Sequence, residues 1–181
     1  MKVKRVCVYC AASKVCDEQH FANGRKLGES LAKLNITVVY GGAHYGVMGA
    51  VADGALQASG KVIGYIPSFM QTEAQHPGLT ELNIVESMHS RKYNMIMNSD
   101  CIIALPGGTG TLDELIEAIS WKRLGLIDLP IFILNINGFY DPLLTMFNNM
   151  FEERFAEPDL RNAWIVVNTI DEILEKIQAI K

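Results

Sequence analysis

Short apolar runs alternate with amphipathic segments along the whole chain. The apolar runs have the length of strands and few polar residues, as is typical of strands covered on both faces. They lie at residues 4–10, 36–40, 61–66, 82–85, 100–105, 130–135 and 165–167. Helices are predicted between them at about 17–34, 50–58, 88–98, from 111 onward, 140–153 and 171–180. The alternation predicts an α/β fold: a Rossmann-like, doubly wound parallel sheet of about seven strands with helices on both faces, in one domain over residues 1–181.

A glycine-rich turn follows the predicted strand at 100–105. Its small residues let the backbone turn sharply and approach a ligand; they are Gly107, Gly108, Thr109 and Gly110. Thr111 is predicted to begin the next helix, whose free N–H groups and positive dipole end favour an anion, most often phosphate. Such turns lie at the carboxyl edge of a parallel sheet, where ligands bind near the reversal of strand order. We therefore expect a phosphate site here, although not a Walker loop, because no G-K-[ST] follows.

Glu114 has two interpretations. Thr111-x-x-Glu114 is a capping-box pattern, in which the glutamate bonds back to the start of its helix. The functional alternative is a carboxylate placed one helical turn from the phosphate site. The local sequence does not decide between the two.

The helical periodicity also predicts which faces are buried. In the helix after the glycine-rich turn, the residues expected to face the sheet are Leu112, Leu115, Ile116 and Ile119. The opposite face then carries Glu114, Glu117, Trp121 and Leu124. An exposed Trp–Leu pair is unusual on a monomer, and it predicts a homodimer. In the helix at 88–98, the predicted inner stripe is His89, Tyr93, Ile96 and Met97, with Arg91 off that stripe.

Composition narrows the possible partners. The 181 residues are 49% hydrophobic and 20% charged, with a formal net charge of −4. There is no basic tract, so we expect no nucleic-acid binding. No run approaches a membrane span and no signal peptide is visible at the N-terminus, so we expect no membrane association and a cytoplasmic location. Cys7 and Cys10 form a C-x-x-C, but residues three apart on a strand point to opposite faces, so we expect no metal site.

A Rossmann-like sheet first suggests a nicotinamide enzyme, and the glycine positions argue against one. The first strand-to-helix turn, residues 10–13, has no G-x-G-x-x-G. The spaced glycines Gly42, Gly46 and Gly49 follow the second strand instead.

The order of motifs resembles that of the LOG (Lonely Guy) family. The segments that carry the resemblance are V-Y-G-G at 39–42, G-V-M-G at 46–49, M-H-S-R-K at 88–92, P-G-G-T-G-T-L-D-E at 106–114 and N-G-F-Y-D at 137–141. The resemblance covers nearly the whole chain. It implies a cytokinin riboside 5′-monophosphate phosphoribohydrolase, which releases free base and ribose 5-phosphate from a nucleoside 5′-monophosphate without metal or organic cofactor. Related sequences often carry the label lysine decarboxylase, but no lysine here is evidently placed for a pyridoxal Schiff base.

The resemblance also implies roles for individual residues. Glu114 and Arg91 would be catalytic. The residues implied to bind substrate or phosphate are Lys92, Gly107, Gly108, Thr109, Gly110, Thr111, Glu73 and Ser120. The sequence departs from the family pattern at Ala11, Ala43 and Thr109, which leaves the preferred base open between cytokinin nucleotides and AMP. The alternative function is a non-catalytic nucleotide-binding or carrier module of the same fold.

Overall fold

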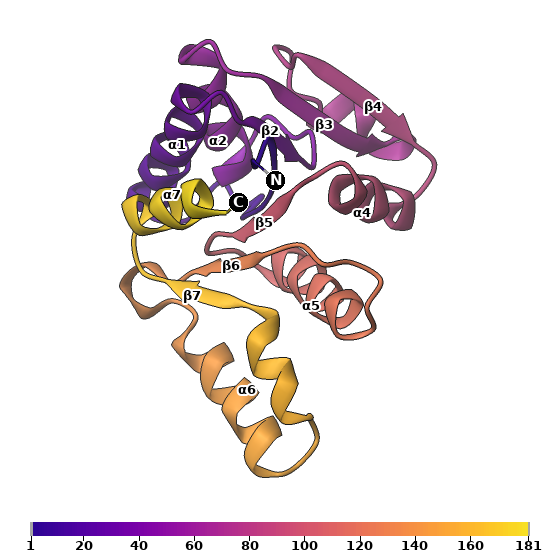
Figure 1. The fold of residues 1–181 in the computed structure, drawn as a ribbon. Helices are drawn as coiled ribbons and strands as arrows, with labels where there is room; N and C mark the ends of the chain where they lie inside the picture. Colours follow the sequence, from indigo (N-terminus) through magenta and orange to yellow (C-terminus); the bar gives the residue numbers. More distant parts are fainter. Residues whose placement is uncertain (1, 181) are drawn as a thin grey trace.

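The computed structural model describes residues 2–180, with the side chains of Thr72 and Glu73 excepted. In this part of the chain seven strands form one parallel sheet (Figure 1). The strands are β1 (Arg5–Tyr9), β2 (Thr37–Tyr40), β3 (Val62–Pro67), β4 (Glu81–Val85), β5 (Cys101–Ala104), β6 (Ile131–Leu134) and β7 (Ile165–Val167). The helices are α1 (Glu18–Lys33), α2 (Gly46–Gln57), α3 (Gln71–Ala74), α4 (Met88–Met97), α5 (Thr109–Arg123), α6 (Asp141–Glu152) and α7 (Ile170–Ala179). The predicted fold class is therefore confirmed.

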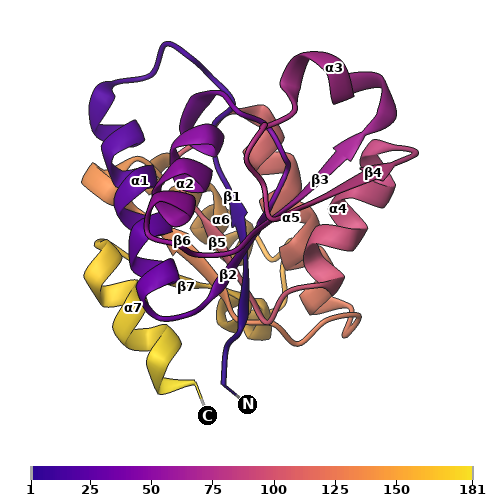
Figure 2. The same cartoon turned by 90° about the horizontal axis from the view of Figure 1, so that it is seen from above.

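Helices cover both faces of the sheet, as Figures 1 and 2 show. On one face α1, α2 and α7 pack through a core that includes Leu31, Val51 and Ile173. On the other face α4, α5 and α6 pack through a second core that includes Ile96 and Leu115. Each apolar strand is thereby buried on both sides, which accounts for the nearly uninterrupted apolar runs in the sequence.

The strand order is β4-β3-β2-β1-β5-β6-β7, so the direction of winding reverses between β1 and β5. These two strands pair in parallel, with Cys7 opposite Ile102 and Tyr9 opposite Ala104. The loops after β1 and β5 consequently leave the same edge of the sheet side by side. A crevice at such a reversal is the usual ligand site of doubly wound folds.

The predicted inner stripe of α4 was wrong. Tyr93 and Met97 are about half exposed, at 52% and 51%, whereas Arg91 and Lys92 are buried at 8% and 7%. His89 is exposed, and of the predicted stripe only Ile96 is buried. The helix is thus rotated so that two cations face α5. A prediction that assigns only apolar residues to the inner face of a helix fails where that face carries buried charged side chains.

The predictions for α5 were wrong at its start and on part of its face. The helix begins at Thr109, with Gly108 as the N-cap, rather than at Thr111. Glu114 is buried and Ile116 is 39% exposed, the reverse of the predicted assignment. Similarly, α2 begins at Gly46, four residues before the predicted start, so Gly46 and Gly49 lie in the helix rather than in a preceding turn.

Candidate active site

The glycine-rich loop joins β5 to an uncapped helix N-terminus. Gly108 is the N-cap of α5, and no side chain accepts a hydrogen bond there. A Cβ on Gly108 or Gly110 would meet no heavy atom within 4 Å, so the space over both residues is open. Gly107 has a different reason to be glycine, because a Cβ there would collide with the Thr111 side chain. The loop therefore presents free N–H groups to open space, an arrangement that favours a phosphate.

Tyr140 holds the base of this loop. Its hydroxyl donates to the Leu105 carbonyl at 2.6 Å, and the Leu105 N–H donates to the Tyr9 carbonyl at 2.9 Å. The backbone N–H of Tyr140 donates in turn to Asn135 Oδ1 at 2.7 Å. Sequence reasoning missed this support, because Tyr140 lies 35 residues after the loop that it holds.

Glu114 and Arg91 face each other across the α4–α5 contact. Arg91 Nη2 lies 4.0 Å from Glu114 Oε1, and each side chain is only 10% exposed. Burial raises the pKa of Glu114 from 4.5 to about 7, although the Arg91 charge opposes that increase. The capping-box interpretation was wrong, because Gly108 is the N-cap and no side chain caps the helix. Glu114 is thus a buried carboxyl group that titrates near neutral pH, a common property of catalytic acids and bases.

Gly41 makes room for Arg91. A Cβ on Gly41 would overlap Arg91 Nη2 and lie 2.7 Å from its Cζ, so the guanidinium lies directly over this glycine. Arg91 Nε is buried without a hydrogen-bond partner among the described residues. Arg91 Nη1 donates to Met88 Sδ at 3.7 Å, a weak contact. Arg91 therefore keeps unused donors beside Glu114, and an anionic ligand or a leaving base could accept from them.

Lys92 lies in an ion-pair cluster. Its ammonium group is 2.9 Å from Asp113 Oδ2 and 3.1 Å from Glu117 Oε2. Burial would lower the pKa of Lys92, but the two carboxylates raise it above its ordinary value. A direct contact of Lys92 with substrate stays a prediction.

The remaining predicted binding residues are more dispersed. Thr109 is exposed at the first position of α5. Ser120 donates its hydroxyl to the Ile116 carbonyl at 2.8 Å and lines a groove between α5 and α6, on the outer side of α5. The side chain of Glu73 lies outside the described residues. Within the described part, no group of three His, Cys, Asp or Glu side chains is arranged to hold a metal ion.

Comparison with known proteins places this chain in a family. The family model described as "Possible lysine decarboxylase" matches residues 48–177. A cytokinin riboside 5′-monophosphate phosphoribohydrolase of Arabidopsis thaliana is 38% identical over 181 residues, covering 99% of this chain and 79% of the relative. One from Rhodococcoides fascians is 38% identical over 178 residues, covering 97% of this chain and 90% of the relative. The chain belongs to this phosphoribohydrolase family. The resemblance on which the site residues were predicted is thus confirmed for the family.

Solved structures of other proteins share the fold of this chain at low sequence identity. The molybdenum cofactor binding protein of Rippkaea orientalis has a TM-score of 0.76 at 22% identity, covering 99% of this chain and 98% of that one. The molybdenum cofactor carrier protein of Chlamydomonas reinhardtii has a TM-score of 0.74 at 18% identity, covering 99% of both chains. At such identities the likeness establishes the fold alone. No helix among the described residues is long and apolar enough to cross a membrane.

Proposed function

We propose that this protein hydrolyses the N-glycosidic bond of a nucleoside 5′-monophosphate, a cytokinin riboside 5′-monophosphate or AMP, to free base and ribose 5-phosphate. The observation that carries the proposal is the buried Glu114 carboxyl group, one helical turn inside an uncapped helix N-terminus and 4.0 Å from Arg91. A phosphate fixed on the loop would bring the sugar, and not the base, closest to the carboxylate.

The chemistry follows from this placement. As the bond from C1′ to the base nitrogen breaks, its electron pair leaves with the base and positive charge develops on the sugar. An ionised Glu114 stabilises that charge and orients a water molecule toward C1′. The water oxygen bonds to C1′ and one of its protons passes to Glu114. The departing base takes up one proton from solvent and Glu114 later returns its own to solvent, so the net reaction consumes one water molecule. Arg91 has free donors with which to stabilise the leaving base or to bind the phosphate.

The test is release of free base from AMP and from isopentenyl-AMP, followed by chromatography. Glu114→Gln should lower kcat by about 10²–10⁴-fold, the usual contribution of an acid–base group. It should bind the nucleotide at least as tightly as the parent, because the N–H groups of the loop are unchanged and a carboxylate that repels phosphate is removed. Turnover at the parent rate in this variant would refute the assignment.

The alternative is a carrier that binds the nucleotide without turnover. The carrier proteins of the same fold make it a reasonable second candidate. A binding module needs the open loop but has no use for a buried carboxyl group beside the bound anion. Parent protein that binds both nucleotides and cleaves neither would establish the carrier and reject the hydrolase.

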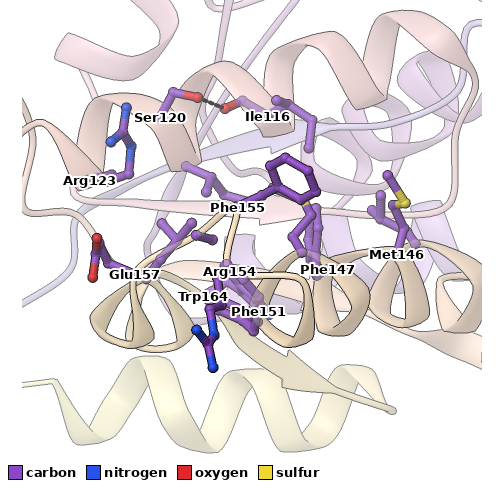
Figure 3. Close-up of a pocket in the computed structure, with 15 residues that line it drawn as sticks. Ile116, Ser120, Arg123, Met146, Phe147, Phe151, Arg154, Phe155, Glu157 and Trp164 are labelled. Atoms are coloured by element: carbon purple, nitrogen blue, oxygen red, sulfur yellow. Dashed lines mark hydrogen bonds between the residues drawn. The ribbon is translucent and has the colours of Figure 1, made fainter.

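We also propose that two copies pair through the outer face of α4, α5 and α6. Large apolar side chains are exposed there, with Phe155 at 83%, Met146 at 57% and Tyr93 at 52%. In Figure 3, Ile116 and Ser120 of α5 face Met146 and Phe147 of α6, and Phe155 lies between the two helices. The groove has a volume of about 560 Å³, and the neighbouring depression along α5 shares Ile116 and Ser120 with it. Apolar exposure on this scale favours a partner subunit.

The dimer has a direct test by light scattering. Ile116→Glu places a charge in the middle of the face and should give the mass of a monomer. Val15→Glu is the matched control, because Val15 is 92% exposed in the loop after β1. A dimer that survives Ile116→Glu would reject this face as the interface. We further propose a cytoplasmic protein that binds neither nucleic acid nor membrane.

A further inference from the structure

Five charged side chains meet where α4 packs on α5. Arg91 and Lys92 come from α4, and Asp113, Glu114 and Glu117 from α5. Asp113 and Glu117 are four residues apart and share one face of the helix, and both carboxylates contact the Lys92 ammonium group. Among the described residues, no ion pair within 4.0 Å joins Lys92 to Glu114, and the Arg91 contact at 4.0 Å is the one that Glu114 has.

The two carboxylates that hold Lys92 differ in burial. The Asp113 side chain is 61% exposed, whereas that of Glu117 is 21% exposed and its Oε2 is buried. Glu117 Oε2 lies 3.1 Å from Lys92 Nζ but has no well-aligned hydrogen-bond donor. Its retention near the core therefore depends on the lysine charge. The Asp113 carboxylate accepts a hydrogen bond from Lys92 Nζ at 2.9 Å but is exposed and screened by solvent, whereas Glu117 holds the lysine charge from the more buried side.

We propose that Glu117 is a positioning residue: it holds the Lys92 ammonium group to one side of Glu114 and so leaves Glu114 facing Arg91 alone. This inference rests on the proposed function of Glu114. Without Glu117, the lysine would keep only its contact with the exposed Asp113, and its flexible stem would allow it to reach the buried carboxylate next to it. A lysine paired with Glu114 would hold that group ionised and occupy the space that the sugar needs.

The charged neighbours of Glu114 belong to α4 and α5. From β1, Tyr9, Cys7 and Cys10 also face it, but burial raises the pKa of each, so all three are neutral at physiological pH. From α4 it meets the two cations, and from its own helix Asp113 and Glu117. A change in the position of the Lys92 charge is therefore expected to shift the pKa of Glu114, because these three neutral groups of β1 do not offset it.

The experiment measures Glu114 directly. Protein labelled with ¹³C at the glutamate carboxyl carbons is titrated by NMR, and the Glu114 signal is assigned by its absence in Glu114→Gln. Glu117→Gln should lower the titration midpoint of Glu114 by about one pH unit, the size expected for a charge shifted at this range in a partly screened site. Asp113→Asn is the matched control on the exposed side: the Asp113 charge also raises the pKa of Glu114 directly, so its effect on the midpoint should be the same with or without the lysine.

A double-mutant cycle separates positioning from simple loss of a charge. If Glu117 acts through Lys92, its effect on the midpoint should fall to less than half in a Lys92→Met background. Lys92→Gln replaces Lys92→Met if far-UV circular dichroism shows the methionine variant to be unfolded. An effect of Glu117→Gln that is the same in both backgrounds, or an effect of Asp113→Asn that depends on Lys92 just as strongly, would overturn the inference.

Activity then gives an independent reading. The acidic limb of the kcat/KM profile for AMP should move to lower pH in Glu117→Gln, together with the NMR midpoint. The titration needs no turnover, so it tests the position of Lys92 even if the base-release assay rejects the hydrolase. Conversely, an unmoved midpoint in an active enzyme would reject the positioning role and leave the proposed function standing.

Discussion

Glu114→Gln is expected to stabilise the folded protein at neutral and alkaline pH. The carboxyl group is buried in the folded state and hydrated in the unfolded state, so its pKa differs between the two. Folding raises that pKa from 4.5 to about 7 because burial disfavours the charged form. Glutamine has nearly the shape of the protonated acid and never ionises, so it removes this cost.

The sign and size follow from proton linkage. The folded state binds the proton more tightly, so the parent loses stability as the pH rises from the unfolded pKa to the folded one. The interval from 4.5 to about 7 spans about 2.5 pH units, and at about 1.4 kcal/mol per unit this is about 3 kcal/mol. Below pH 4.5 the parent and Glu114→Gln should be equally stable, and above pH 7 the variant should exceed the parent by the full amount.

Urea unfolding of both proteins at several pH values from 4 to 8.5 measures this difference. Other titrating groups are common to the two proteins and cancel in the comparison. The difference in unfolding free energy should be near zero at the acidic end and rise with pH to a plateau. A flat difference across the whole range would refute the claim that the Glu114 carboxyl group is buried with a raised pKa.

Two further substitutions test the supports of the site. Gly41→Ala should displace the Arg91 guanidinium and lower kcat/KM by about 10²-fold, whereas Gly78→Ala, whose Cβ would meet its nearest heavy atom at 3.5 Å, should leave base release unchanged. Tyr140→Phe removes the hydrogen bond to the Leu105 carbonyl and should cost about 1 kcal/mol of stability in urea unfolding, with a raised KM for the nucleotide. Parent-like kinetics in either site variant would show that the corresponding contact does not support the site.

The sequence carried enough information to predict the sheet and the glycine-rich loop at its edge. Strand-length apolar runs and 3.6-residue periodicities are local signals, and all seven strands were found close to their predicted limits. The glycines of the loop after β5 were also interpretable locally, since a plain strand-to-helix turn does not need three of them. What failed was the rotation of α4 and α5 about their own axes. The buried faces of these helices carry Arg91, Lys92 and Glu114, and apolar periodicity cannot identify a buried face that is charged.

The contacts between distant segments were beyond sequence reasoning for a different reason. Gly41 and Arg91 are fifty residues apart, and the need for a glycine arises only because the Arg91 side chain reaches over the residue that follows β2. Tyr140 reaches Leu105 because β6 lies beside β5. Such contacts depend on strand order and on how far each loop extends beyond the edge of the sheet, and no single segment specifies either. The motif resemblance indicated which residues matter there, but not how they touch.

The unsatisfied groups of the site favour catalysis over storage. The open N-terminus of α5 and the free donors of Arg91 favour the binding of an anion. A nucleotide carrier would need the same groups. Glu114 favours a cationic group instead, because a buried carboxylate repels a bound phosphate and is stabilised by positive charge. A ground-state nucleotide satisfies the first requirement alone. The transition state of glycosidic cleavage satisfies both, since it holds an anionic phosphate and a cationic sugar within one molecule. A protein that retained Glu114 only to bind nucleotides would lose both stability and affinity by doing so, and that double cost is the strongest physical argument for the hydrolase.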